Sequence, residues 1–92
     1  MKVFLTKTFE KEYKKCPNNI QNNIKEILLE LNSSDDIMKI KNIKKLVGYN
    51  AYYRIRLGSW RIGLEFENDI IKICTMLSVK SRGDIYKHFP PK

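Results

Sequence analysis

The chain has 92 residues, which suits one small domain, and we take residues 1–92 as a single unit. Its 18 Lys and Arg against 10 Asp and Glu give a formal net charge of +8, which points to nucleic acid, a ribosome-like surface or an acidic protein as the partner. No apolar stretch approaches the length of a membrane span, and the apolar N-terminal stretch is far too short for a signal peptide. The composition therefore predicts a cytoplasmic protein without a membrane partner.

The first third of the chain predicts a short strand followed by two helices. Residues 1–5 read as a strand, and Thr6 is an N-cap for a helix that ends near Lys15. Pro17 suits the start of a second helix. The apolar face of that helix carries residues at helical spacing, namely Ile20, Ile24, Ile27, Leu28 and Leu31. The polar residues 32–36 end it.

The middle of the chain is rich in lysine. Residues 37–46 interleave four lysines, among them Lys44 and Lys45, with apolar side chains. The pattern fits either an extended segment or a short helix, and the sequence favours neither. Residues 47–50 then read as a turn.

The most informative segment is residues 52–63, which read as a β-hairpin around a Gly58-Ser59 turn. Alternate side chains of a strand point to opposite faces. One face of the hairpin then carries Tyr52, Arg54, Arg56 and Arg61. The turn places Arg56 directly opposite Arg61, and like charges so placed destabilise a sheet by a few tenths to about 1 kcal/mol. A bound polyanion explains their presence, because arginine forks match phosphate oxygens in pairs.

The C-terminal third predicts one more strand and a short helix. Asn68-Asp69 reads as a tight turn, followed by a strand over residues 70–79. A two-residue turn places Lys72 opposite Glu65 on the arginine face. The same phase puts Cys74 and Met76 beside Lys72, and Ile71, Ile73 and Leu77 in the core. Residues 81–89 can form one or two helical turns.

This order of elements predicts a small single-domain α+β fold. Two N-terminal helices pack on a mostly antiparallel four-stranded sheet, and a short helix ends the chain. The two cysteines, Cys16 and Cys74, do not make a disulfide framework, and we read both as reduced thiols. No His and Cys spacing indicates zinc, and we expect neither a metal nor a small-molecule cofactor.

Several stretches carry a family likeness. They are the initial strand, a Phe-x-x-x-Tyr helix, a second helix led by proline, the stretch KLVGYNAYYRIRLGSWRIGLEFEND and the closing SVKSRGDIYKHFP. Together they cover nearly the whole chain and resemble the RelE/ParE superfamily of toxins from type II toxin–antitoxin systems. The Tyr-Tyr-Arg-Ile-Arg and Asp-Ile-Tyr-Lys-x-Phe-Pro motifs look most like the RelE branch.

The RelE-like branch implies a ribosome-dependent endoribonuclease. Such an mRNA interferase cuts mRNA in the ribosomal A site, inhibits translation, and is neutralised by a cognate antitoxin protein. ParE-type proteins have the same fold but poison DNA gyrase. Fold alone does not separate the two activities, so the site must.

Cleavage of RNA without a metal needs a phosphate held in line, stabilisation of its developing charge and two proton transfers. The basic face carries no cluster of carboxylates, so a two-metal site is not expected. By its place in the resemblance, Arg61 is the candidate that stabilises the phosphate in the transition state. Arg54 and Arg56 are expected to bind neighbouring phosphates, and Lys80 or Arg82 a further one.

The proton acceptor is the open part of this site. In several family members lysines stand at the places of Arg54 and Arg56, and one is proposed as the general base. Arginine stays protonated and cannot take that role. Tyr86, which matches the family's C-terminal tyrosine, Lys80 and His88 remain. A dense cationic cluster favours proton loss from a tyrosine or lysine, whereas an imidazole titrates near neutral pH by itself.

Each candidate also has a plainer interpretation. Arg54 and Arg56 can form a polar strand face that pairs with antitoxin carboxylates. Tyr52 either stacks on a base or covers the sheet edge. Tyr86 can pack on the sheet with a solvated hydroxyl, and His88 can be a solvated tail residue. Because Tyr86 and His88 are two apart in a helical turn, at most one should point into the site.

Two questions stay open at this point. Lys44 and Lys45 either form a solvated face or contact ribosomal RNA. Such a contact would be strongly salt-dependent. For the whole chain, the alternatives to the nuclease are a ParE-like gyrase inhibitor and a catalytically weak module that only binds an antitoxin.

Overall fold

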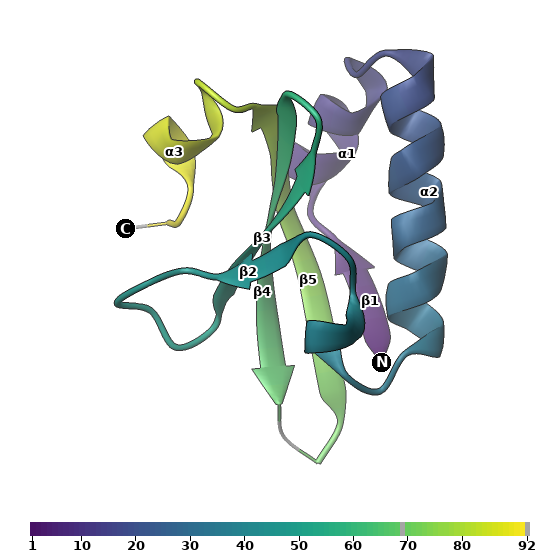
Figure 1. Ribbon diagram of the computed structural model, residues 1–92, viewed down its shortest axis with the longest axis vertical. Coiled ribbons are helices and arrows are strands. Elements are labelled where there is room, and N and C mark those ends of the chain that lie inside the picture. Colours follow the sequence, from purple (N-terminus) through teal and green to yellow (C-terminus); the bar gives the residue numbers. More distant parts are fainter. Residues whose placement is uncertain (69, 92) are drawn as a thin grey trace.

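The computed structural model describes residues 1–68 and 70–91. Its elements in chain order are β1 (Lys2–Leu5), α1 (Lys7–Lys14), α2 (Asn18–Ser33), the short 3-10 helix η1 (Ile37–Lys39), β2 (Ile43–Lys45), β3 (Tyr52–Leu57), β4 (Trp60–Asn68), β5 (Lys72–Ser81) and α3 (Ile85–His88). Helices α1 and α2 lie on one side of the sheet, and α3 lies on the other (Figure 1). No helix among the described residues combines the length and apolar character needed to cross a membrane.

The sheet has the strand order β1-β5-β4-β3-β2. β1 pairs with β5 in parallel, and the other neighbours are antiparallel. The predicted α+β class, mostly antiparallel sheet and short C-terminal helix are confirmed. The strand count is five rather than four, because part of the lysine-rich segment pairs with β3, bringing Ile43 opposite Ile55. That segment takes both of the forms left open, a helical turn first and a strand after it.

The two N-terminal helices begin where the sequence predicts. The Thr6 hydroxyl accepts a hydrogen bond from the Phe9 N–H at 3.1 Å, which caps α1. It also donates to the Met76 carbonyl at 3.0 Å and so ties the start of α1 to β5. Pro17 precedes α2 directly. The predicted apolar face of α2 is buried in the core, at Ile20, Ile24, Ile27 and Leu31.

The β3–β4 hairpin has the predicted turn and register. Gly58 has a φ of +57° in the turn, a conformation that glycine adopts without strain. Leu57 pairs with Trp60, and Arg56 pairs with Arg61. The alternation along β3 also holds, because Ile55 is buried in the core while Arg56 is exposed.

The start of β5 differs from its prediction. Asn68 pairs with Lys72, so three residues separate the paired ends of β4 and β5 rather than two. Glu65 pairs with Thr75, and the predicted pair of Lys72 with Glu65 is wrong. The tight turn expected at Asn68-Asp69 includes a residue outside the described ranges.

The faces of β5 change with its register. Cys74 and Met76, predicted on the arginine face, are buried in the core. Ile71, predicted in the core, is exposed, and Ile73 and Leu77 are only partly buried. The longer connection shifts by one residue which side chains of β5 point to each face of the sheet. A bulge within the β4–β5 ladder shifts this alternation by one residue again.

Burial of Cys74 predicts a loss of stability at alkaline pH. The side chain is fully buried, and burial raises the pKa of its thiol to about 12. A raised folded-state pKa means that the stabilisation is complete below the unfolded value, near pH 9, and is lost as pH rises toward 12. We therefore expect the unfolding free energy from urea titrations to fall more between about pH 7 and about pH 10 in the wild type than in Cys74→Ala. Equal falls would contradict this assignment.

Candidate nucleic-acid interface

Four arginines gather on the face of the sheet that α1 and α2 leave uncovered. We call Arg54, Arg56, Arg61 and Arg82 the arginine cluster. Arg82 follows β5 and is brought to the β3–β4 turn by its own N–H, which donates to the Ser59 carbonyl at 2.8 Å. Arg56 pairs with Arg61, Arg54 shares their face, and the charges of the other three arginines all lower the pKa of Arg61.

Arg61 has an unusual environment for a charged side chain. It is 9% exposed, and its Nη1 donates to the carbonyls of Gly58 at 2.6 Å and Trp60 at 2.9 Å. Burial is the largest cause that lowers its pKa, followed by the charge of Arg54, while Tyr86 acts in the opposite direction. Arginine nevertheless stays protonated at any useful pH. Arg61 is therefore a mostly buried cationic residue held close to like charges.

The cluster has no carboxylate to balance it within the described ranges. The ion pairs found over residues 1–68 and 70–91 all involve lysines: Lys39 with Asp35, Lys80 with Glu12, and Lys87 with Asp84. The side chains of Arg54 and Arg61 instead donate to backbone carbonyls, which carry only partial charge. Such a cluster can attract and hold the phosphates of a polyanion.

Asn42, which directly precedes β2, forms hydrogen bonds with two of these arginines. Asn42 has a φ of 63°. Its carbonyl accepts from the Arg56 N–H at 3.1 Å and from Arg54 Nη1 at 3.3 Å. Lys44 pairs with Arg54 and so shares its face, whereas Lys45 pairs with Tyr53 and faces the other way. The structure thus brings Lys44 toward the cluster and leaves Lys45 apart from it.

The C-terminal tail folds back over the same face. Phe89 is 2% exposed, and its ring lies against Gly63, where an added Cβ would sit 2.6 Å from the ring. It also makes an edge-to-face contact with Tyr52 at 5.7 Å between ring centroids, and Tyr52 makes another with Tyr49 at 5.6 Å. Tyr52 therefore packs within the protein, which favours its covering role over stacking on a base.

Tyr86 and His88 point to different places, as expected of residues two apart. Tyr86 is about half exposed and lies near enough to Arg61 for its charge to act on the pKa of the guanidinium. His88 lines a pocket of about 430 Å³ beside the end of β5, together with Thr8 and Lys80. Tyr86 is therefore the tail residue that the fold places with the arginine cluster.

The position of the Lys80 ammonium differs most from the expectation that Lys80 acts on the substrate. It pairs with Arg61 across β4 and β5, yet its Nζ lies 2.8 Å from the Glu12 carboxylate of α1. This hydrogen bond raises the pKa of Lys80, the opposite of what a cationic neighbourhood alone would do. The geometry speaks against Lys80 as the base. Glu12 was missed, because nothing in the sequence links it to a strand 66 to 68 residues away.

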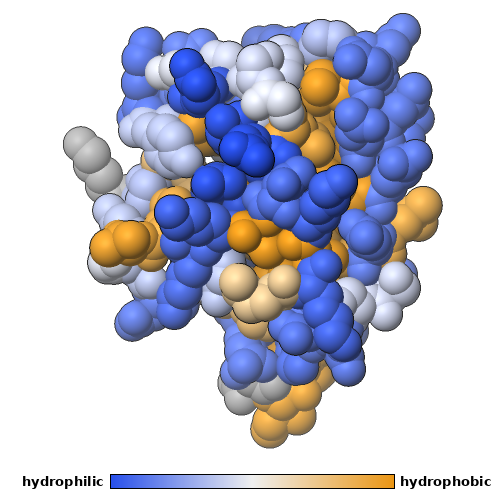
Figure 2. Space-filling view, in the orientation of Figure 1, coloured by the Kyte–Doolittle hydropathy of each residue, from blue (hydrophilic) through white to orange (hydrophobic). Residues whose placement is uncertain are grey.

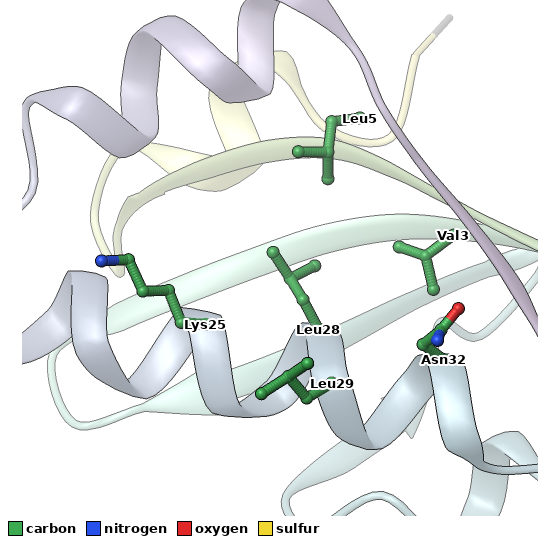
Figure 3. A pocket seen from close by; sticks show the side chains of 6 residues that line it. All are labelled: Val3, Leu5, Lys25, Leu28, Leu29 and Asn32. Carbon is green, nitrogen blue, oxygen red and sulfur yellow. The ribbon is translucent and has the colours of Figure 1, made fainter.

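The molecular surface has both polar and apolar areas. Figure 2 shows one face that is mostly hydrophilic, with separate hydrophobic patches, one of them at its lower tip. Ile70 and Ile71, between β4 and β5, are exposed. An apolar groove of about 510 Å³ lies between β1 and α2, where Val3 and Leu5 approach Leu28 (Figure 3). Among the described residues, no three His, Cys, Asp or Glu side chains are placed together to hold a metal ion.

Comparisons with known proteins agree with this architecture. No family model matches the chain. It is 44% identical over 91 residues to toxin RelE3 of Methanocaldococcus jannaschii, covering 98% of this chain and 100% of that protein. The chain belongs to the RelE toxin family. The RelE likeness extends to a chain of the RelB–RelE antitoxin–toxin complex from Methanococcus jannaschii, with 40% identity, a TM-score of 0.76, and coverage of 96% of this chain and 100% of that one.

More distant RelE structures share the fold. A chain of the intact E. coli RelBE toxin–antitoxin complex has 23% identity and a TM-score of 0.68, covering 87% of this chain and 94% of that one. A chain of the Mycobacterium tuberculosis RelBE2 complex has 21% identity and the same TM-score of 0.68, covering 90% and 92%. At these identities the likeness concerns the fold alone.

Proposed function

We propose that this RelE-family chain is a ribosome-dependent mRNA endoribonuclease that inhibits translation. Arg61 carries the proposal, because this mostly buried arginine sits among three like charges and, within the described residues, donates to two backbone carbonyls and to no carboxylate. A cation in that setting is stabilised by an incoming phosphate, most strongly when negative charge builds up on the phosphate oxygens. The 44% identity to a RelE toxin supports the same activity.

The proposed reaction needs no metal ion. The ribose 2′-oxygen attacks the adjacent phosphorus and the bond from phosphorus to the 5′-oxygen breaks. The products are a 2′,3′-cyclic phosphate and a 5′-hydroxyl. Arg61 stabilises the phosphate as charge develops, while Arg54, Arg56 and Arg82 hold neighbouring phosphates in place. One proton leaves the 2′-hydroxyl and another reaches the 5′-oxygen.

Tyr86 is the residue we assign to proton transfer, because it matches the family's C-terminal tyrosine and its charge acts on the pKa of Arg61. Tyr86→Phe removes only the hydroxyl and should lower the cleavage rate by about 100-fold or more. The ring is half exposed, so the free energy of unfolding should change by less than about 0.5 kcal/mol. His88→Gln, at the pocket beside β5, is the matched variant and should retain most of the activity. Single-turnover cleavage with both variants checks the assignment, and a larger loss in His88→Gln would reverse it.

The proposed partners follow from the family and the charge. The related structures contain RelB antitoxins with their RelE chains, and we propose that a cognate antitoxin protein binds and neutralises this chain as well. The ribosome and its mRNA are the proposed targets, with Lys44 as a further contact to RNA. The site of action would be the cytoplasm, where translation takes place.

Primer extension on ribosomes programmed with a defined mRNA tests the proposal. Wild-type protein should produce new 3′ ends inside the A-site codon, while the same mRNA free in solution stays intact. A DNA gyrase supercoiling assay run in parallel should show no inhibition. Intact mRNA on the ribosome together with inhibited gyrase would favour the ParE-like activity. Intact mRNA with no toxicity on overexpression would leave a module that only binds an antitoxin.

A further inference from the structure

Glu12 of α1 makes three contacts with consecutive residues of β5. Its Oε1 accepts from the Ser78 hydroxyl at 2.6 Å and from the Val79 N–H at 3.2 Å. Its Oε2 lies 2.8 Å from Lys80 Nζ. The Glu12 side chain is 11% exposed and that of Lys80 is 32% exposed. A carboxylate that is mostly buried and bonded on both oxygens has a fixed position.

The position of Glu12 is also fixed by the attachment of the start of α1 to β5. β1 pairs with β5 as far as Leu5 and Met76, and beyond that point no strand among the described residues lies on this edge of β5. Thr6 ties the start of α1 to this edge through the Met76 and Leu77 carbonyls. The Glu12 carboxylate then accepts a hydrogen bond from the Val79 N–H on this edge of β5, where a residue of a neighbouring strand would otherwise accept it.

The contact with Lys80 concerns the arginine cluster directly. Lys80 pairs with Arg61, so its side chain starts on the same face of the sheet. Its ammonium is nevertheless drawn to α1. It lies 2.8 Å from the Glu12 carboxylate, while the charges of the three other cluster arginines lower the pKa of Arg61. Lys80 therefore pairs with a residue of the arginine cluster, but its ammonium is bound to Glu12 and adds little positive charge to the cluster.

We propose that Glu12 is a positioning residue that holds the Lys80 ammonium away from the arginine cluster and so limits how strongly this face binds an RNA backbone. The proposal rests on the proposed function, because it takes RNA as the ligand of the cluster. An ammonium already paired with a carboxylate gains little from a phosphate. Releasing it would add a contact that holds substrate, transition state and product equally, which tightens binding without speeding cleavage.

Binding of a labelled single-stranded oligoribonucleotide, followed by fluorescence anisotropy over a range of salt concentrations, tests this role. Glu12→Gln keeps an oxygen for Ser78 and Val79 but removes the charge that holds Lys80. One additional phosphate contact should steepen the slope of log K against log salt by about 0.7. The double variant Glu12→Gln with Lys80→Met should return to the wild-type slope. Glu10→Gln, which makes the same charge change on an exposed part of α1, should leave the slope unchanged.

The outcomes separate this proposal from the proposed function. If Arg61→Met binds the RNA as well as the wild type, the arginine face is not the RNA site and both proposals fail. If Arg61→Met binds weakly while Glu12→Gln keeps the wild-type slope, only the role of Glu12 is overturned.

A second variant covers the case in which Glu12→Gln does not fold. Lys80→Met alone should keep the wild-type salt slope, because Lys80 contacts no phosphate while Glu12 holds it. A fall of about 0.7 in that slope would mean that Lys80 already contacts the RNA, and would overturn the proposal. On programmed ribosomes, Glu12→Gln should lower KM and leave the single-turnover rate unchanged, which a purely structural role would not produce.

Discussion

Replacing Arg61 with methionine is expected to reduce mRNA cleavage on programmed ribosomes by about 100-fold or more. Arg61 is the most buried residue of the arginine cluster, so we expect its charge to interact most strongly with charge that develops on a phosphate. Methionine retains an apolar stem of similar length but removes the charge and all donors. Single-turnover primer extension, with the protein in excess over ribosomes, measures the effect on the chemical step.

The same substitution should leave stability nearly unchanged. It removes hydrogen bonds to the Gly58 and Trp60 carbonyls, each of which contributes about 1 kcal/mol. It also removes the cost of burying a cation close to like charges. We therefore expect the free energy of unfolding at low salt to change by no more than about 1 kcal/mol. A strongly destabilised variant would show that Arg61 is mainly structural.

Arg61→Lys serves as the charge-preserving control. Lysine keeps the positive charge but not the planar fork, so it cannot donate in pairs to two phosphate oxygens. The loss of one charged hydrogen bond corresponds to a rate about 10-fold lower or more. Full activity in Arg61→Lys would mean that charge alone, and not the geometry of the guanidinium, supports cleavage.

Gly63→Ala is expected to displace the C-terminal tail from the arginine face. A Cβ at this position would lie 2.6 Å from the Phe89 ring, which is fully enclosed and cannot easily move aside. Overpacking of this kind costs about 1–3 kcal/mol. Because α3 carries Tyr86 three residues before Phe89, we also expect cleavage to fall. Urea titration and single-turnover cleavage of the same preparation measure the two effects.

Gly83→Ala is the matched control for this prediction. Nothing lies within 4 Å of a Cβ added at Gly83, which precedes α3, so stability and activity should be retained. Phe89→Ala should cost about 3–5 kcal/mol by emptying the site that the ring fills. Combining Gly63→Ala with a smaller residue at Phe89 should cost less than the sum of the two changes, because both act on one contact. Strict additivity would contradict the packing described here.

Local patterns predicted much of the fold. The Thr6 cap, the apolar face of α2 and the Gly58-Ser59 hairpin all depend on residues close together in the sequence, and all three are confirmed. The pairing of Arg56 with Arg61 follows from the turn alone. Errors arose where a register depends on the length of a connection. One additional residue after Asn68 was enough to exchange the two faces of β5 up to the bulge, beyond which Lys80 again lies opposite Arg61.

The candidate site was predictable only in part. The arginines of the hairpin share a face because of strand alternation, and Tyr86 was expected from the family likeness. The pairing of Glu12 with Lys80 and the packing of Phe89 on Gly63 join residues far apart in the sequence. A glycine within a strand otherwise rich in large side chains was the available signal for a close approach at Gly63. No comparable signal marked Glu12.

The chemistry assigned to the arginine cluster is tested most directly by a change in the RNA rather than in the protein. Ribosomes are programmed with two mRNAs that differ only by a 2′-deoxyribose on the 5′ side of the A-site cut. We predict cleavage of the unmodified mRNA to a 2′,3′-cyclic phosphate end, and no cleavage at the modified position. Equal cleavage of both mRNAs would contradict attack by the 2′-hydroxyl, and with it the role given to Arg61.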